Sequence, residues 1–328
     1  MVLPIGERRK RMNVTVVVPT IREECIGRFL DAWEPQFRKP DVRVIVMEDH
    51  QEPQFHLPDW VEHYSHADAE AKLGEKASCI ARRSGACNAF GIWLAAQQPT
   101  EMIVCLDDDC LPLPDVSLLD DHWAALRRPA TVGWFRVADQ YTRGFPYLIR
   151  EKATVVLNHG LWAGVPDLDA IQQAAGLTFD LGDYRRWGHV PRGCYFPMSG
   201  MNLAFRREFA PFVYFWNLPD GMKRWADIWC GLVLKRIADV QDWAIALGMP
   251  LVRHDRASNI WANLRQEAGG YEINEELWSF LDEVDIRGMA PLVAYTFLAA
   301  KIGQRFPALA EATGHMRTWA SLWEGWKE

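Results

Sequence analysis

The sequence has no long apolar segment. No stretch approaches the roughly 20 consecutive apolar residues that span a bilayer. The basic residues from Arg8 to Arg11 precede only a short apolar run, which Pro19 closes without a small-residue cleavage site. We therefore expect a soluble protein with no transmembrane segment and no signal peptide.

Metal-binding cysteine spacings and excess positive charge are also missing. The seven cysteines form no CxxC pair and no zinc spacing, which favours a reduced chain in the cytoplasm. There are 36 Lys and Arg against 43 Asp and Glu, a net charge of -7, which argues against nonspecific nucleic-acid binding. No GxGxxG follows the first predicted strand, so the usual dinucleotide fingerprint is absent.

What is present is the pattern of an α/β protein. Hydrophobic residues make up 49% of the 328 residues and charged residues 24%, as in globular domains. Apolar runs at 14–18, 42–47 and 103–106 predict buried strands, and further strands are predicted at 131–137, from 202 and at 251–254. Helices are predicted at 24–33, where Pro35 and Pro40 would stop the first, at about 80–94, and from about 275 onward. Residues 51–69 look irregular. This order predicts a mainly parallel sheet flanked by helices.

Three consecutive carboxylates, Asp107, Asp108 and Asp109, end the strand predicted at 103–106. Side chains alternate along a strand, so Asp107 and Asp109 should point one way and Asp108 the other. Adjacent acids repel one another unless a cation or hydrogen-bond donors compensate them. Oxygen ligands suit Mg²⁺ or Mn²⁺, which also bind substrate phosphates. The alternative is a solvated acidic turn that caps the next helix.

Polar residues follow the first two strands at positions where open α/β sheets bind ligands. Thr20 and Arg22 follow the first strand, and Asp49 follows the second, where a carboxylate would suit a ribose or a base edge. Lys76 precedes the second helix and could meet a phosphate there, or be solvated.

The second half contributes further candidates. Arg143 and Arg150 lie seven residues apart in a segment with Gly and Pro. The stretch 159–170 is rich in aromatic, carboxylate and Gly residues, which suits a small-molecule pocket. Asp227 opens a predicted helix, as a surface acid or a site carboxylate. From this half we assign four residues to nucleotide or sugar binding: His159, Trp162, Asp167 and Asn202.

Eight blocks together resemble the reversibly glycosylated polypeptides, the UDP-arabinopyranose mutase family. In order they are VVVPTIRE, GEKASCIARRSGAC, CLDDDC, TRGFPYLIRE, HGLWAGVPDLDA, FPMSGMNLAF, WADIWCG and HDRASN, within residues 14 to about 265. The resemblance implies a GT-A-like nucleotide-sugar-binding catalytic domain over 1–270, with a helical extension over 271–328 packed on it. It also implies a nucleotide-diphosphate sugar partner, a divalent metal and no flavin, and allows a homo-oligomer.

The implied activity interconverts the pyranose and furanose forms of the nucleotide-linked sugar. By resemblance, Asp107 to Asp109 and His254 bind the metal, while Arg143, Arg150 and Asp227 are catalytic, Arg143 being the family's glycosylated residue. Two departures leave the sugar and the base open, UDP or GDP: Ala226 stands where plant members have a second acid, and Ala163-Gly164 replaces a bulkier pair.

Breaking and re-forming the C1–phosphate bond loads negative charge onto the diphosphate, which a divalent cation and arginines would stabilise. Arg143 could carry the sugar covalently or stabilise an ion pair electrostatically. The chemistry of a guanidinium favours the second role and the glycosylated arginine of the resembled family favours the first, so both stay open. Two rival functions remain at this stage: a glycosyltransferase or self-glycosylating protein, and a non-catalytic scaffold.

Overall fold

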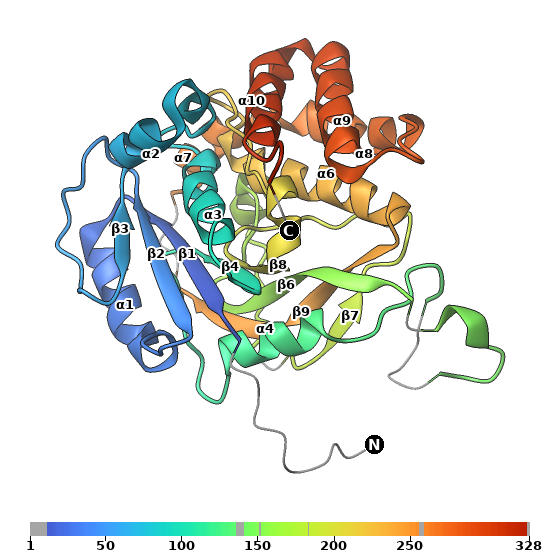
Figure 1. The fold of residues 1–328 in the computed structure, drawn as a ribbon, viewed down its shortest axis with the longest axis horizontal. Helices are drawn as coiled ribbons and strands as arrows, with labels where there is room; N and C mark the ends of the chain where they lie inside the picture. The colour runs from blue at the N-terminus through green and yellow to red at the C-terminus, as the bar shows by residue number, and fades with distance from the viewer. Residues whose placement is uncertain (1–11, 136–140, 151, 183, 256–258, 327–328) are drawn as a thin grey trace.

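A nine-stranded sheet forms the centre of the part of the chain that is described. The computed structural model describes residues 12–135, 141–150, 152–182, 184–255 and 259–326. The strand order is β3-β2-β1-β4-β8-β6-β9-β5, with β7 on β9 (Figure 1). The strands are β1 (Val14–Thr20), β2 (Val42–Glu48), β3 (Glu62–Tyr64), β4 (Met102–Leu106), β5 (Cys110–Leu111), β6 (Thr154–Gly164), β7 (Trp187–His189), β8 (Asn202–Arg206) and β9 (Trp243–His254).

Most paired residues lie in parallel ladders, so the predicted Rossmann-type, mainly parallel sheet is confirmed. β1 pairs in parallel with β2 and β4, β2 with β3, and β6 with β9. β8 is antiparallel to both β4 and β6. In the parallel half, the strand order runs from β1 outward to β2 and β3 on one side and then changes to the other side, where β4 pairs with β1. In open α/β sheets, ligands bind outside the carboxyl ends of the strands at such a change of side.

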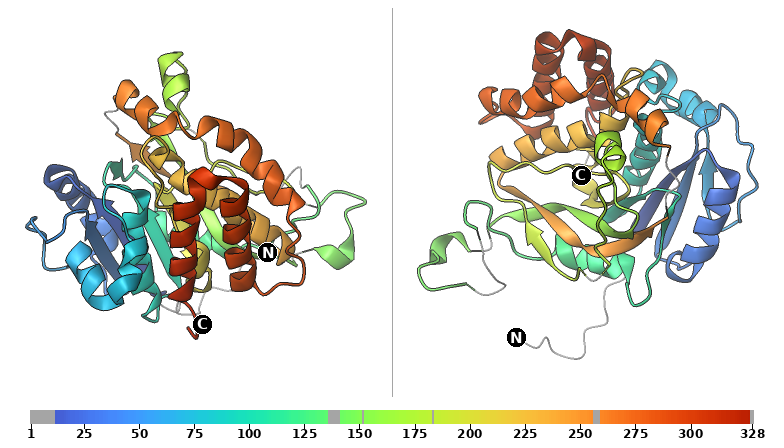
Figure 2. Two further views of the ribbon diagram at one scale, coloured as in Figure 1. Left: turned by 90° about the horizontal axis from the view of Figure 1, so that it is seen from above. Right: turned by 180° about the vertical axis from the view of Figure 1, so that it is seen from behind.

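Helices cover both faces because successive strand residues point to opposite sides. Val16 and Val18 pack with α1 and α4 on one face, while Val17 packs with α3 and α6 on the other (Figures 1 and 2). The helices are α1 (Glu23–Phe37), α2 (His66–Leu73), α3 (Asn88–Ala96), α4 (Leu118–Leu126), α5 (Ala170–Ala174), α6 (Ala226–Val240), α7 (Ile260–Glu267), α8 (Tyr271–Glu283), α9 (Pro291–Arg305) and α10 (Ala310–Ser321). Short 3₁₀ turns are η1 (Gly74–Cys79), η2 (Gly85–Cys87), η3 (Tyr147–Ile149), η4 (Arg207–Phe212), η5 (Lys223–Trp225) and η6 (Pro307–Leu309).

The C-terminal helices α8 to α10 lie on the α3–α6 face (Figure 2). Leu277, Leu298 and Trp319 are completely buried in the same apolar cluster as Phe90 of α3 and Trp229 of α6. The helical appendix therefore shares its core with the sheet domain. The division into 1–270 and 271–328 stays a prediction, although α8 does begin at Tyr271. In the described residues, no helix is both long and apolar enough to cross a membrane.

Several predicted elements have different bounds. The first helix continues to Phe37 with Pro35 inside it, because Trp33 and Phe37 stack at 4.8 Å and the Trp33 indole donates to the carbonyl of Cys110, which anchors the last turn. Residues 131–135 form no strand; an isolated bridge joins the preceding residue, Ala130, to Ala153. The rest of that predicted strand, 136–137, lies outside the described residues, as do Arg8 to Arg11 and residues 256–258 of the last block.

The predictions for three further stretches, as loop or helix, were wrong. Within 51–69 the chain forms β3 and the start of α2, which a capping box of Ser65 and Asp68 begins. The predicted helix at 80–94 begins only at Asn88, after the 3₁₀ turns. The loop predicted from His159 is instead the second half of β6, as far as Gly164.

Candidate active site

The three acids lie in a tight turn between β4 and β5, at the point where the parallel strand order changes side. The backbone N–H of Cys110 donates to the carbonyl of Asp107 at 3.1 Å, which closes the turn. The carboxyl end of β1 lies beside them, because β1 pairs with β4. Thr20, Arg22 and the acidic triplet are thereby brought together, as their positions after strands predicted.

Asp108 is buried and holds the loop after β1. Its Oδ2 accepts a hydrogen bond from the Thr20 hydroxyl at 2.7 Å, and its Oδ1 forms an ion pair with the Arg22 guanidinium. Arg22 also lies 3.4 Å from an oxygen of Asp109. Both oxygens of Asp108 are therefore engaged with the β1 loop, so this carboxylate organises the loop.

Asp109 faces His254 from the neighbouring strand. Cys110 in β5 pairs with His254 at the end of β9, which leaves His254 Nε2 3.9 Å from Asp109 Oδ1. His254 Nδ1 lies 2.8 Å from the carbonyl of Val165. A carbonyl can only accept, so Nδ1 carries a proton, and in the neutral imidazole Nε2 then has a lone pair available toward Asp109. A backbone carbonyl commonly fixes a metal-binding imidazole in this way.

Asp107 and Asp227 add unbalanced negative charge. Although Asp107 is exposed at the surface, its pKa lies well above its usual range, because nearby protein atoms limit its hydration and because the carboxylates of Asp109, Asp108, Asp227 and Asp167 repel its charge. Burial, with a contribution from Asp167, raises the pKa of Asp227 to about 6. Asp227, in the first turn of α6, accepts the N–H groups of Gly200 at 2.9 Å and Ile228 at 3.0 Å. Five carboxylates therefore influence one region.

Within this set, Asp109 and His254 are close enough to share a divalent cation. Carboxylate oxygens and one imidazole nitrogen are ligands that Mn²⁺ accepts. Two ligand atoms on one such ion lie roughly 3–4 Å apart, and the Asp109–His254 distance falls in that range. A bound cation would also remove the repulsion that raises the pKa of Asp107.

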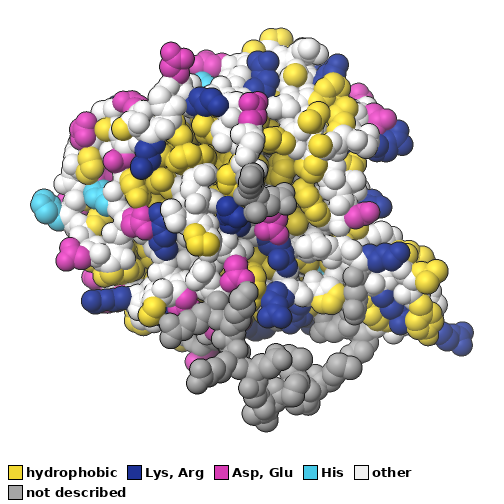
Figure 3. Space-filling model, viewed as in Figure 1, with side chains coloured by type: hydrophobic (Ala, Val, Ile, Leu, Met, Phe, Trp, Pro, Cys, Tyr) yellow, Lys and Arg dark blue, Asp and Glu magenta, His cyan; other side chains and the backbone are white. Residues whose placement is uncertain are grey.

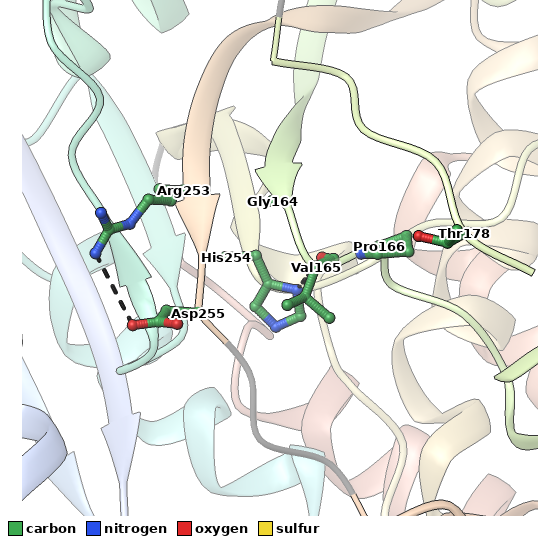
Figure 4. A pocket seen from close by; sticks show the side chains of 7 residues that line it. All are labelled: Gly164, Val165, Pro166, Thr178, Arg253, His254 and Asp255. Atoms are coloured by element: carbon green, nitrogen blue, oxygen red, sulfur yellow. Dashed lines mark hydrogen bonds and ion pairs between the residues drawn. The ribbon is translucent and has the colours of Figure 1, made fainter. Parts of the chain in front are cut away.

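An open pocket of about 520 Å³ borders His254. Its walls come from the ends of β6 and β9 and the segments that follow them; they are Gly164, Val165, Pro166, Thr178, Arg253, His254 and Asp255. Figure 4 shows Arg253 and His254 on opposite sides of β9, with Arg253 directed to Asp255 at 3.9 Å. The pocket predicted from the stretch 159–170 is therefore formed in part by its middle residues.

Asp49, after β2, lies beside the β1 loop. Its backbone N–H donates to the carbonyl of Thr20 at 2.7 Å. Its carboxylate accepts from His66 Nε2 at 2.8 Å and from the backbone N–H of Arg83 at 2.7 Å. Asp49 is thus part of the same sheet edge as the acidic triplet. Asp167 lies near enough to Asp107 and Asp227 to affect their titration.

Three predicted ligand-binding residues, Asn202, His159 and Lys76, contact other residues of the protein. Asn202 is completely buried and bonds the carbonyls of Leu161 and Pro250 as well as His122. His159 is buried and neutral, because burial lowers its pKa to about 4, and it accepts from the N–H of Ser199. The Lys76 ammonium donates to the carbonyl of Ser321 in α10. His159 Nδ1, however, is buried and has no hydrogen-bond partner among the described residues, and the binding roles of all three residues stay predictions.

Trp162 is half-buried and packs against the apolar cluster on the face of the sheet that α1 and α4 cover. Its indole nitrogen has no hydrogen-bond partner among the described residues. It lies in β6, two residues before the pocket wall at Gly164.

Arg143 and Arg150 do not lie at the acidic site. Their segment, 141–150, projects from the edge of the molecule and precedes the start of β6 (Figures 1 and 2). The pocket lies at the other end of that strand, where Gly164 pairs with His254, and ten residue steps of strand span roughly 30 Å. Arg150 stacks on Tyr141 and Tyr147 at 4.4 and 3.9 Å, within its own segment.

The sequence analysis missed His66 and Glu48. Glu48 is completely buried and accepts from His50 and His63 at 2.7 Å each and from the N–H groups of Gln54 and Phe55, which shapes the loop after β2. The Ser65-x-x-Asp68 capping box was a local signal for the helix that carries His66.

The comparisons with known proteins agree with the resemblance seen in the sequence. UDP-arabinopyranose mutase 3 of Arabidopsis thaliana is 32% identical over 339 residues, covering 95% of this chain and 91% of that protein. UDP-arabinopyranose mutase 1 of Oryza sativa subsp. japonica is 31% identical over 336 residues, covering 95% and 90%.

The solved mannosyltransferase PcManGT of Pyrobaculum calidifontis, in complex with GDP-Man and Mn²⁺, covers 98% of this chain and 89% of that chain at 14% identity, with a TM-score of 0.42. This likeness is too distant to carry an argument. The sequence profile of the reversibly glycosylated polypeptides matches residues 9–328. The chain belongs to the reversibly glycosylated polypeptide family.

Proposed function

We propose that this protein is a divalent-metal-dependent, flavin-independent nucleotide-sugar mutase. It would interconvert pyranose and furanose forms of a UDP-arabinose-like sugar, or of a UDP- or GDP-linked hexose, by breaking and re-forming the C1–phosphate bond. The observation that carries the proposal is the acidic turn facing the free nitrogen of His254, in a chain whose relatives are named UDP-arabinopyranose mutases.

Asp107, Asp109 and His254 are the proposed metal ligands. Asp108 is engaged with Thr20 and Arg22, so we assign it to loop positioning rather than direct coordination. When bound, the cation would neutralise charge that develops on the diphosphate. Arg22, held beside Asp109, is placed to share that charge.

Thr20, Arg22 and Asp49 form the proposed nucleotide side of the site, and the pocket beside His254 the sugar side. Asp167 and Asp227 complete the sugar side. Asp227 has a pKa of about 6 and can therefore hold or release a proton near neutral pH. Ring contraction frees one ring oxygen, which takes up a proton, and closes the ring through another hydroxyl, which gives one up. One carboxyl group can serve both oxygens.

We propose Arg143 and Arg150 as catalytic residues, which requires that their segment be brought to the pocket. From the far end of β6 they reach the pocket only if segment 141–150 folds back along the sheet or if another copy of the chain supplies it. Hydrophobic and basic side chains gather where this segment projects (Figure 3), and Tyr147 and Leu148 are 83% and 84% exposed. A homo-oligomer would cover them.

We also infer a cytoplasmic protein, since all seven cysteines are unpaired thiols. The second candidate function is a glycosyltransferase that uses the same nucleotide-sugar site. The open pocket favours it, since an acceptor could enter there.

The decisive experiment is to incubate the purified chain with UDP-arabinopyranose and Mn²⁺, without any acceptor, and to follow the anomeric signals by NMR. A furanose signal that reaches equilibrium, and that disappears reversibly on chelation, is expected. If sugar is released or transferred only when an acceptor is added, the protein is a transferase. Full turnover in excess chelator would refute the metal dependence. UDP- and GDP-hexoses tested in parallel would identify the substrate.

A further inference from the structure

The carboxylate of Asp49 is held from two sides at the end of β2. Only 11% of its side chain is exposed. Oδ1 accepts from His66 Nε2 at 2.8 Å, and Oδ2 accepts from the backbone N–H of Arg83 at 2.7 Å. Since the Asp49 backbone is also fixed to Thr20, the carboxylate has one defined orientation.

His66 reaches Asp49 from a rigid support. It is the first residue of α2, and the capping box of Ser65 and Asp68 fixes the start of that helix. Its side chain is only 4% exposed. A carboxylate accepts and cannot donate, so His66 Nε2 carries a hydrogen directed at Asp49.

Arg83, whose backbone N–H donates to Asp49, has an unfavourable backbone conformation. Its φ of 52° lies in the left-handed region, which an L-residue with a Cβ seldom adopts. The bond from its N–H to Asp49 compensates that conformation. Strain of this kind concentrates where a binding site needs a fixed geometry.

We propose that His66 is a positioning residue for Asp49, and that the pair forms a preorganised acceptor for the N–H or hydroxyl donors of the nucleoside. An ionised carboxylate offers about four acceptor positions, and two are occupied here. Because the side chain is already ordered, a nucleotide would not have to immobilise it on binding. This inference rests on the proposed nucleotide site.

The same side chains could bind a metal ion instead of positioning Asp49 for a nucleoside. The Cys87 thiol lies with the Asp49 carboxylate and His66 so that their ligand atoms are all within 4.8 Å of one another. Sulfur, nitrogen and oxygen donors of this kind bind zinc. The direct hydrogen bond between Asp49 and His66 favours positioning, because a shared metal would replace its proton.

The experiment measures UDP binding by calorimetry, and KM and kcat for UDP-arabinopyranose, in His66→Ala, His66→Gln, Asp49→Ala and the double variant Asp49→Ala/His66→Ala. His66→Ala should raise Kd and KM about tenfold with kcat within about twofold, as expected for the loss of one charge-assisted hydrogen bond. His66→Gln, whose amide can donate, should recover most of the affinity. The double variant should be no weaker than Asp49→Ala alone.

His63→Ala is the matched control, because it removes a similar histidine–carboxylate bond from the adjacent Glu48. An equal loss of affinity in this control would overturn the inference by showing a general effect of the strand end. Unchanged binding in His66→Ala, with weakened binding in Asp49→Ala, would overturn the inference and leave the nucleotide site intact. No effect of Asp49→Ala would instead remove Asp49 from the proposed function.

Cobalt binding tests whether Asp49, His66 and Cys87 hold a metal ion. Co²⁺ added to the metal-free protein should give no thiolate-to-cobalt charge-transfer absorption. Such a band, present in the wild type and absent in Cys87→Ser, would show a metal at Asp49, His66 and Cys87 and would overturn the positioning role.

Discussion

At the scale of single residues, neighbouring acids of one triplet have different tasks. Asp109→Ala removes a proposed metal ligand and should abolish Mn²⁺ binding, whereas Asp108→Asn disturbs the ion pair with Arg22 and should mainly weaken nucleotide binding. We expect at least a tenfold loss of Mn²⁺ affinity for the first variant and less than threefold for the second, measured by electron paramagnetic resonance titration.

Asp285→Asn is the control, since this exposed acid pairs with Arg287 on the surface and should change neither affinity. Equal Mn²⁺ affinity in wild type and Asp109→Ala would exclude Asp109 as a ligand.

The raised pKa values of Asp107 and Asp227 would make the proposed metal binding depend on pH. In the metal-free folded chain these groups bind protons that the unfolded chain has already lost, so their contribution to stability decreases as pH rises from about 4 through the folded pKa of Asp227, about 6. A cation replaces those protons and relieves the repulsion.

The increase in Tm on adding Mn²⁺ should therefore be several degrees at pH 7.5 and markedly smaller at pH 5.5, by differential scanning calorimetry. Asp109→Ala should show no increase at either pH. A larger increase at the lower pH would contradict the proposed competition between protons and metal.

At the scale of elements, the contact of β6 with β8 and β9 sets the position of His254. A Cβ on Gly160 would lie 2.2 Å from Asn202 Nδ2 and 2.6 Å from the carbonyl oxygen of Pro250, in the buried network that joins these strands. Gly160→Ala should lower the free energy of unfolding by about 1–3 kcal/mol, because the strands must separate to admit the methyl group.

Gly188→Ala in β7 is the matched control: nothing lies within 4 Å of its added Cβ, and the change should be within about 0.5 kcal/mol. Urea denaturation measures both variants. Equal stability of the two would show that the strands shift at little cost.

At the scale of the whole molecule, the C-terminal helices complete the core. Trp319 of α10 is fully buried, stacks on Tyr214 at 5.5 Å and donates to the carbonyl of Pro211. Trp319→Ala should cost about 3–5 kcal/mol of unfolding free energy, whereas Trp278→Ala, 46% exposed on α8, should cost less than about 1 kcal/mol.

Both variants should unfold in one cooperative transition, followed by tryptophan fluorescence and circular dichroism. A separate early transition in Trp319→Ala, with the sheet still folded, would show that residues 271–328 form an independent unit. That result would support a domain boundary near 270.

The family, the α/β class and the residues after β1, β2 and β4 could all be predicted from the amino-acid sequence. These follow from local causes: apolar runs form buried strands, and polar residues after parallel strands meet at one edge. The β4 acids and Asp49 were identifiable for this reason. Pro35 and the segment before α3 were misjudged, because tertiary contacts such as the Trp33–Phe37 stack override local propensity.

The contacts of each side chain follow from the tertiary structure. It joined Asp109 to His254, 145 residues further along, because β5 pairs with the end of β9. It engaged Asp108 with Arg22, buried Asn202 and His159 among structural partners, and placed Arg143 beyond the opposite end of β6. Sequence spacing fixes periodicity within an element, whereas long-range pairing fixes which elements are neighbours, and the composition of this site depends on the second.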